Sequence, residues 1–229
     1  MNVLEFDTNI NILEIESGFN QTEIETLHCV VKNYFEKDFL TKIKNFPRPI
    51  VKSYGDVVER KLGRFEIIPS KEINNQIWDI LLKNDTFVKY NKMAKNEIKR
   101  ILDEDVVEEM CLLPVEPGVV DGEYHRDIFV KSPEDFSGMP FYITHIIYLD
   151  NISSTIYCIG SQTNPDSNPL IYPKLTVQSD YGKMVLFDGR IIHKGLGNKS
   201  NTTRYAIYIS YYKKSYTDEE SVLPYLFEK

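Results

Sequence analysis

One stretch of the sequence does most to decide the fold: Gly182-Lys183-Met184-Val185-Leu186-Phe187-Asp188-Gly189-Arg190-Ile191-Ile192-His193. It holds two short apolar runs, Lys183–Phe187 and Arg190–His193, with Asp188-Gly189 between them. An Asp-Gly pair supplies the positive φ angles of a type I′ turn, so the stretch predicts two strands joined in a tight hairpin.

The same texture continues on both sides of this stretch, from Val106 to Tyr212. Short apolar and aromatic runs alternate with Gly, Pro, Asn, Asp and Ser, and there are eight of them: Val106–Val115, Glu123–Val130, Phe141–Leu149, Thr155–Ile159, Leu170–Gln178, Lys183–Phe187, Arg190–His193 and Arg204–Tyr212. Eight short strands without intervening helices predict a jelly-roll or barrel over residues 106–212. The 15 Tyr and 12 Phe against a single Trp fit this, because aromatic residues favour strands.

Residues 1–105 are instead helix-rich, with one possible strand at Lys61–Ile68. Asn20 and Ser70 are the expected N-caps of the first two helices. Apolar residues at helical spacing mark three helices: Ile24, Leu27, Val31, Tyr34 and Phe35; Ile73, Ile77, Ile80 and Leu81; and Phe87, Tyr90, Ala94, Ile98 and Ile101. We expect these helices to buttress the barrel within a single domain, residues 1–229, whose residues 213–229 form a C-terminal tail.

Length, composition and charge exclude several classes of protein. A chain of 229 residues, 42% hydrophobic and 27% charged, is long enough for one well-packed domain. A net charge of −7 argues against general binding to nucleic acid phosphates. The sequence also contains no 18-residue apolar run of the kind that would predict a membrane span. The first residues lack the basic region of a signal peptide, and the three cysteines, Cys29, Cys111 and Cys158, are widely separated. Together these features favour a cytoplasmic protein with reduced thiols.

Two histidines and one aspartate are the candidate metal ligands. His125 and Asp127 are two residues apart on an expected strand, so their side chains leave the same face, and His193 ends a later strand. Two imidazoles and one carboxylate form the set that binds non-haem Fe(II) and leaves coordination positions open. A His-x-acid pair is weak by itself, since 34 of the 229 residues are acidic.

Arg204 strengthens this assignment. It follows His193 across a loop rich in Gly, Asn and Ser, residues 194–203, and begins the run Tyr205–Ser210. An arginine that enters a barrel needs an anion, and its guanidinium offers two parallel hydrogen bonds to a carboxylate.

The order of these motifs resembles the iron(II)/2-oxoglutarate-dependent dioxygenases, and more narrowly the phytanoyl-CoA dioxygenase-like group. The resemblance covers about Val106 to Tyr212 and rests on these segments: Tyr124-His125-Arg126-Asp127, Tyr148-Leu149-Asp150, Ile159-Gly160-Ser161-Gln162, Gly182–Asp188, and His193 with Asn198, Ser200 and Arg204. Ile159 and Gln162 replace the Pro and His that are usual in that group, which bears on the subfamily and the substrate. The resemblance implies a double-stranded β-helix (jelly-roll, cupin-like) core with flanking helices.

The resemblance also implies roles for single residues. His125, Asp127 and His193 would hold Fe(II), Arg204 would pair with the distal carboxylate of 2-oxoglutarate, and dioxygen would take the remaining position. In this group a residue of the third strand helps to hold the cosubstrate. Strand parity separates Thr144, favoured here as a hydroxyl donor, from His145, expected to be structural.

The implied reaction is hydroxylation, or another oxidation, of a C–H bond in a small or medium-sized metabolite, with release of succinate and CO2. Asp127 favours hydroxylation, because related halogenases lack the carboxylate. Arg126 alternates to the opposite face and is expected to pair with a loop. Two other hypotheses stay open: a cupin-type metal enzyme that does not use 2-oxoglutarate, and a non-catalytic β-barrel binding module. Neither the substrate nor the oligomeric state can be read from the sequence.

Overall fold

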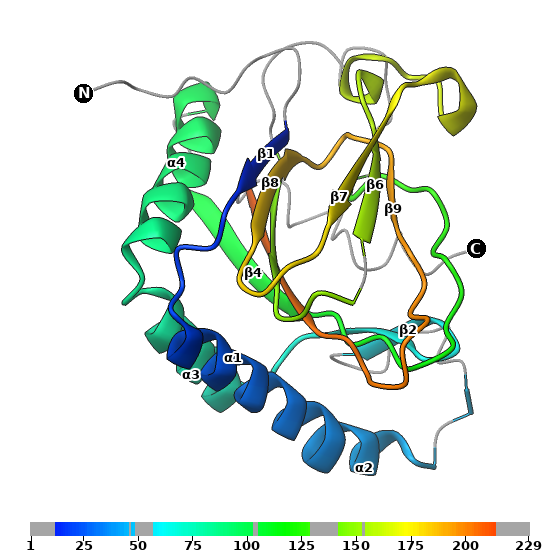
Figure 1. Ribbon diagram of the computed structural model, residues 1–229. Coiled ribbons are helices and arrows are strands. Elements are labelled where there is room, and N and C mark those ends of the chain that lie inside the picture. Colours follow the sequence, from blue (N-terminus) through cyan, green and yellow to red (C-terminus); the bar gives the residue numbers. More distant parts are fainter. Residues whose placement is uncertain are drawn as a thin grey trace.

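Two antiparallel sheets face each other in the computed structural model, which describes residues 12–45, 47–48, 57–102, 105–128, 142–152 and 154–213 (Figure 1). The larger sheet has the strand order β1 (Ile12–Ile15), β8 (Met184–Asp188), β5 (Tyr142–Tyr148), β10 (Ala206–Lys213), β4 (Val106–Leu112), β3 (Arg64–Ile67) and β2 (Val57–Lys61). The smaller sheet has the order β7 (Lys174–Gln178), β6 (Ser154–Cys158) and β9 (His193–Gly195).

The jelly-roll prediction is confirmed. Six of the eight expected runs each correspond to one strand, β4 to β8 and β10, whereas the run Arg190–His193 meets β9 only at its last residue, because β9 begins at His193. The described part of the eighth, Glu123–Val130, joins the smaller sheet through an isolated bridge between His125 and His193. Some bounds differ: Leu170 lies in a 3-10 turn, η4 (Pro169–Ile171), before β7 begins, and another turn, η3 (Ser161–Thr163), follows β6.

The predicted hairpin at Asp188-Gly189 is wrong. Strand β8 pairs with β1 and β5 in the larger sheet, whereas β9 pairs with β6 in the smaller one. The chain therefore crosses between the sheets at a turn in which the Ile191 amide donates to the Asp188 carbonyl, 2.9 Å. Gly189 does not have positive φ; its role is steric, because a Cβ there would lie 2.5 Å from Cδ1 of Tyr142.

Helices cover the outer face of the larger sheet, as predicted. They are α1 (Gln21–Asn33), which continues through a π-helix, η1 (Tyr34–Phe39), into α2 (Leu40–Ile43), then α3 (Lys71–Leu81) and α4 (Asp85–Leu102). Asn20 caps α1 in a reciprocal capping box with Glu23, and Ser70 caps α3. Both signals were read correctly because capping depends on residues only three positions apart.

The N-terminal region holds more β-structure than the sequence predicts. The expected strand at Lys61–Ile68 is a hairpin of β2 and β3, which turns at Leu62-Gly63 with Gly63 at φ 83°. The short strand β1 was not predicted, and it completes the edge of the larger sheet beside β8.

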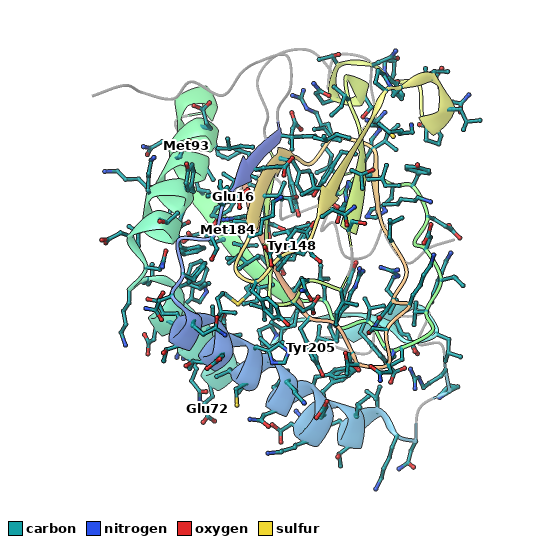
Figure 2. All side chains as sticks on the ribbon, viewed as in Figure 1. Glu16, Glu72, Met93, Tyr148, Met184 and Tyr205 are labelled. Atoms are coloured by element: carbon teal, nitrogen blue, oxygen red, sulfur yellow. The ribbon has the colours of Figure 1, made fainter. Side chains whose placement is uncertain are left out.

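Alternation along β5 divides the core into two layers. Ile143 and Ile147 pack toward the helices, whereas Ile146 packs between the sheets. Met184 and Tyr205 belong to the helix-facing layer and Tyr148 to the inter-sheet layer (Figure 2). The candidate metal ligands lie in the inter-sheet layer, where His193 contacts Tyr157 and Phe187. Among the described residues, none of the helices is both long and apolar enough to cross a membrane.

Candidate metal centre

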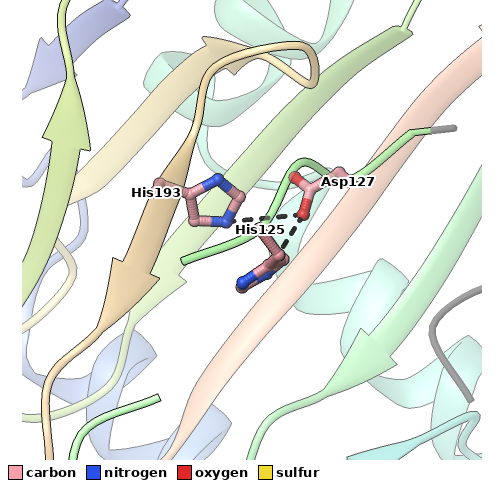
Figure 3. A group of neighbouring side chains, drawn as sticks. All are labelled: His125, Asp127 and His193. Atoms are coloured by element: carbon pink, nitrogen blue, oxygen red, sulfur yellow. Dashed lines mark ion pairs between the residues drawn. The ribbon is translucent and has the colours of Figure 1, made fainter. Parts of the chain in front are cut away.

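The backbone holds the three candidate ligands together. His125 and His193 exchange amide-to-carbonyl hydrogen bonds of 2.9 Å in each direction, and the Asp127 amide donates to the Gly189 carbonyl, 2.9 Å. The side chains of His125, Asp127 and His193 then converge between the sheets (Figure 3). Residues far apart in the sequence are thus brought together as the sequence predicted.

The donor atoms fit a divalent metal ion. Oδ1 of Asp127 lies 3.4 Å from Nε2 of His193 and 3.7 Å from Nε2 of His125. One ligand atom from each residue can be chosen with all three within 4.8 Å of one another. Ligands at right angles around an ion with bonds of about 2.1 Å are separated by roughly 3 Å, so only small side-chain movements are needed.

Hydrogen bonds fix which nitrogen of each histidine faces the site. Nδ1 of His125 lies 2.9 Å from the Glu123 carbonyl, and Nδ1 of His193 lies 3.0 Å from the Ile191 carbonyl. Because a carbonyl only accepts, each Nδ1 carries the proton and each Nε2 presents a lone pair. Outer hydrogen bonds of this kind orient metal-binding histidines in general.

Aromatic rings restrict the His193 imidazole further. Tyr157 stacks on it at a centroid distance of 5.8 Å, and Phe187 meets it edge to face at 4.9 Å. His193 is 5% exposed and Asp127 4%, whereas the His125 side chain is 28% exposed. Solvent therefore reaches the site from the His125 side.

Thr144 faces the inter-sheet layer, as strand parity predicts. Its hydroxyl donates to Oδ2 of Asp127, 2.6 Å. Its expected contact with the cosubstrate stays a prediction. His145 points the other way, into the helix-facing core, where it stacks on Phe87 of α4 at 5.5 Å. Burial lowers the pKa of His145 to about 3, so the ring is neutral and structural, as expected.

Arg126 pairs with a loop, as expected from its position between two ligands. Its guanidinium donates to the carbonyls of Ser161 (2.8 Å), Asn164 (3.1 Å) and Asp166 (3.2 Å), and to that of Arg190. The loop after β6 is thereby attached to the ligand-bearing segment. Burial lowers the pKa of Arg126, and Tyr172 opposes this shift.

A buried ion pair that the sequence did not reveal supports the crossing between the sheets. Arg190 and Asp188 are each 0% exposed and face one another at 2.6 Å, Nη2 to Oδ2. The Arg190 amide also donates to Asp188 Oδ1, 2.9 Å. Burial raises the pKa of Asp188, and the guanidinium opposes this shift. The pair fixes the turn whose carbonyls hold both Asp127 and His193.

Arg204 lies close to Gly195 of β9, the strand that begins at His193. Its backbone forms an isolated β-bridge with Val115. Its Nη2 lies close to Gly195, because a Cβ atom added to that glycine would be only 3.4 Å away from it. Gly195 is two residues beyond His193 on β9, so both face the same side, separated by roughly 6.6 Å along the strand. Burial lowers the pKa of Arg204, and the Asp150 carboxylate opposes this shift most.

A second arginine, Arg64, comes from strand β3 and was missed in the sequence. It lies in one row with Val115 and Arg204, and its Nη1 would be 3.1 Å from a Cβ on Gly195. Its Nη2 donates to the carbonyls of Val120 and Leu196, 3.1 Å each. The N-terminal region thus places a second guanidinium beside Gly195, next to Arg204, and only the strand pairing reveals it.

Comparisons with known proteins identify the fold class. No protein-family model and no curated protein matches the chain. Among solved structures, AviO1 from Streptomyces viridochromogenes Tue57 is similar at 16% identity and a TM-score of 0.62, over 94% of this chain and 98% of that one. The non-heme alpha ketoglutarate dependent epimerase SnoN from nogalamycin biosynthesis is similar at 11% identity and 0.57, over 90% and 78%.

A third structure is EctD from S. alaskensis with 2-oxoglutarate and 5-hydroxyectoine, at 15% identity and a TM-score of 0.58, over 90% of this chain and 73% of that one. The chain therefore has the jelly-roll fold found in non-heme α-ketoglutarate-dependent enzymes. Within that fold it carries a His-Asp-His triad made of His125, Asp127 and His193.

Proposed function

We propose that the protein is an Fe(II)/2-oxoglutarate-dependent oxygenase that oxidises a C–H bond of a small or medium-sized metabolite and releases succinate and CO2. One observation carries the proposal: Arg204 reaches Gly195 on the strand, and on the face, that also presents His193. The spacing along β9 is comparable with the length of an extended five-carbon dicarboxylate. A metal chelate at one end and a guanidinium at the other suit 2-oxoglutarate.

Each residue has a defined part in this proposal. His125, Asp127 and His193 hold the iron through two Nε2 atoms and one carboxylate oxygen. Bound iron, with 2-oxoglutarate and dioxygen, supplies the oxidising power for the C–H bond. Arg204 pairs with the distal carboxylate, and its burial strengthens that pair because water competes less.

Hydroxylation is the outcome we propose, within a phytanoyl-CoA dioxygenase-like group. The presence of Asp127 supports it, since the carboxylate keeps a third protein ligand on the metal. Two of the similar structures are an epimerase, SnoN, and a carbocyclase, SnoK, so this fold also hosts reactions other than hydroxylation. The three cysteines, which form no disulfide, support a cytoplasmic location.

Binding of 2-oxoglutarate to the Mn(II)-loaded protein, measured by calorimetry without dioxygen, tests the proposal. Arg204→Met keeps most of the side-chain length and removes the charge. Loss of one partner of a buried charge pair costs about 2–5 kcal/mol, so Kd should rise by at least roughly 30-fold. The control Lys95→Met removes a charge from the Lys95–Glu108 pair near the surface and should leave Kd unchanged.

Turnover completes the test: with Fe(II) and dioxygen the wild type should convert 2-oxoglutarate to succinate, and Arg204→Met should be slow at low cosubstrate concentration. Equal 2-oxoglutarate binding by Arg204→Met and wild type would favour the cupin-type alternative. Failure of His193→Ala to change metal binding would favour a non-catalytic module.

A further inference from the structure

The two oxygens of the Asp127 carboxylate have different surroundings. Oδ1 faces the Nε2 atoms of His193 and His125, at 3.4 and 3.7 Å (Figure 3). Oδ2 accepts the hydroxyl hydrogen of Thr144 at 2.6 Å. Both residues are buried, Asp127 at 4% exposed and Thr144 at 0%. The carboxylate therefore presents one oxygen to the metal position while the other is bound to the protein.

Thr144 is well placed to keep this arrangement. It lies in the middle of β5, paired with Phe187 of β8 on one side and Ser210 of β10 on the other. As a β-branched residue in a central strand it has few accessible rotamers. The pairing of the strand on both sides and the few rotamers of the side chain thus fix the hydroxyl that holds Oδ2.

The number of carboxylate oxygens on the metal decides how many positions stay open. With one oxygen and two imidazoles, three positions remain, enough for a two-atom chelate and dioxygen. With both oxygens bound, only two would remain, and the chelate would fill them. A short hydrogen bond to Oδ2 competes with the metal for that oxygen.

We propose that Thr144 is a positioning residue that holds Asp127 to one-oxygen metal ligation. The inference rests on the proposed function, since it concerns the same metal site. It also differs from the sequence-based expectation that Thr144 donates to the cosubstrate. A threonine hydroxyl has one hydrogen, and here that hydrogen is donated to Asp127.

Titration of the protein with Co(II), followed by visible absorption, tests the proposal without turnover. Thr144→Val replaces the hydroxyl with a methyl group of similar size. We expect the Co(II) Kd to rise about 10–100-fold, the usual effect of losing an outer hydrogen bond to a metal ligand. The band shape should also change, because cobalt absorption depends on coordination number. Thr144→Ser restores a hydroxyl and should restore both the affinity and the spectrum.

Thr155→Val is the matched control. Thr155 is also a buried strand threonine, but its hydroxyl bonds Tyr148 at 2.8 Å. Its Co(II) Kd and spectrum should equal those of the wild type. If Thr144→Val does not fold, Thr144→Ala removes the same hydroxyl with a smaller side chain and should raise the Co(II) Kd in the same way; an unchanged Kd would overturn the proposal.

The outcomes separate this proposal from the proposed function. Wild-type Co(II) affinity and spectrum in Thr144→Val, with weaker 2-oxoglutarate binding, would overturn the positioning role and favour direct contact with the cosubstrate. Co(II) binding by the wild type that His193→Ala does not weaken would instead reject the metal site itself. A structure of cobalt-loaded Thr144→Val should show Asp127 bound through both oxygens or turned away; unchanged one-oxygen ligation would count against us.

Discussion

Replacing Arg126 with methionine should detach the loop after β6 from the segment that bears the metal ligands. The guanidinium donates to four backbone carbonyls, those of Ser161, Asn164, Asp166 and Arg190. Methionine retains the apolar contact of the stem but donates no hydrogen bond. The variant therefore tests the hydrogen bonds rather than the packing.

The cost follows from which carbonyls water can reach. Asp166 is exposed and Asn164 partly so, and water can replace the arginine at both. Ser161 and Arg190 are 0% exposed, so their carbonyls lose a charged donor without replacement. Such bonds contribute about 1.5–3 kcal/mol each. Burial of the guanidinium, which lowers the pKa of Arg126, offsets part of this. A net loss of about 2–4 kcal/mol remains.

Thermal unfolding of the metal-free protein measures the loss. For a chain of this length a loss of 2–4 kcal/mol corresponds to a fall in Tm of roughly 5–15 °C. Limited proteolysis should cut the loop, residues 159–173, faster in Arg126→Met than in the wild type. Arg126→Lys should be intermediate, because a single ammonium cannot span four carbonyls. Lys95→Met, a control near the surface, should stay within about 1 kcal/mol of the wild type.

A decrease in Tm of less than about 2 °C would refute the assignment of Arg126 as the residue that attaches the loop to the ligand-bearing segment. So would a large fall in Tm without faster cleavage of the loop, since the lost stability would then come from elsewhere.

Three further predictions concern stability. Burial lowers the pKa of His145 to about 3, whereas in the unfolded chain the ring takes up a proton near pH 6.5. The free energy of unfolding therefore falls as the pH drops below that value, by about 2 kcal/mol at about pH 5. In urea unfolding, His145→Phe should lose less stability than the wild type between about pH 7.5 and 5, and parallel profiles would contradict this. Gly189→Ala brings a methyl group to 2.5 Å from the Tyr142 ring and should cost about 1–3 kcal/mol by thermal unfolding, whereas an unchanged Tm would mean that the ring moves aside. Mn(II) at about 100 times its Kd should raise the free energy of unfolding by about 2.7 kcal/mol; a chelator should reverse the gain, His193→Ala should abolish it, and a gain retained by that variant would place the metal elsewhere.

The residues that sequence reasoning placed correctly are those governed by local periodicity. Alternation along β5 separated Thr144 from His145, and the pleat of a β-strand enforces this wherever the strand lies. The expected strand around His125 and Asp127 is only an isolated β-bridge at His125, and hydrogen bonds to His193 and Gly189 hold these two residues instead. Parity did not reveal which group the Thr144 hydroxyl would meet. That partner, Asp127, comes from a different part of the chain.

Local signals gave the turn at Asp188-Gly189 but not its partners. An Asp-Gly turn looks the same in sequence whether the next strand returns beside the first or crosses to another sheet. Here Arg190 is buried against Asp188, and the chain crosses. Strand β1, only four residues long, was missed for a related reason: its main support is the backbone of β8, which no local pattern reports.

The crossing turn explains why the fold and the metal site depend on each other. Its Gly189 carbonyl accepts from the Asp127 amide, and its Ile191 carbonyl orients the His193 imidazole. The Arg190 carbonyl accepts from Arg126, which lies between the other two ligands. All of these contacts use backbone carbonyls of the turn, so their positions depend on its shape. A turn that closed a simple hairpin would hold β9 beside β8 and leave His193 away from Asp127. The buried ion pair that sequence reasoning missed thus supports the ligand geometry that it predicted.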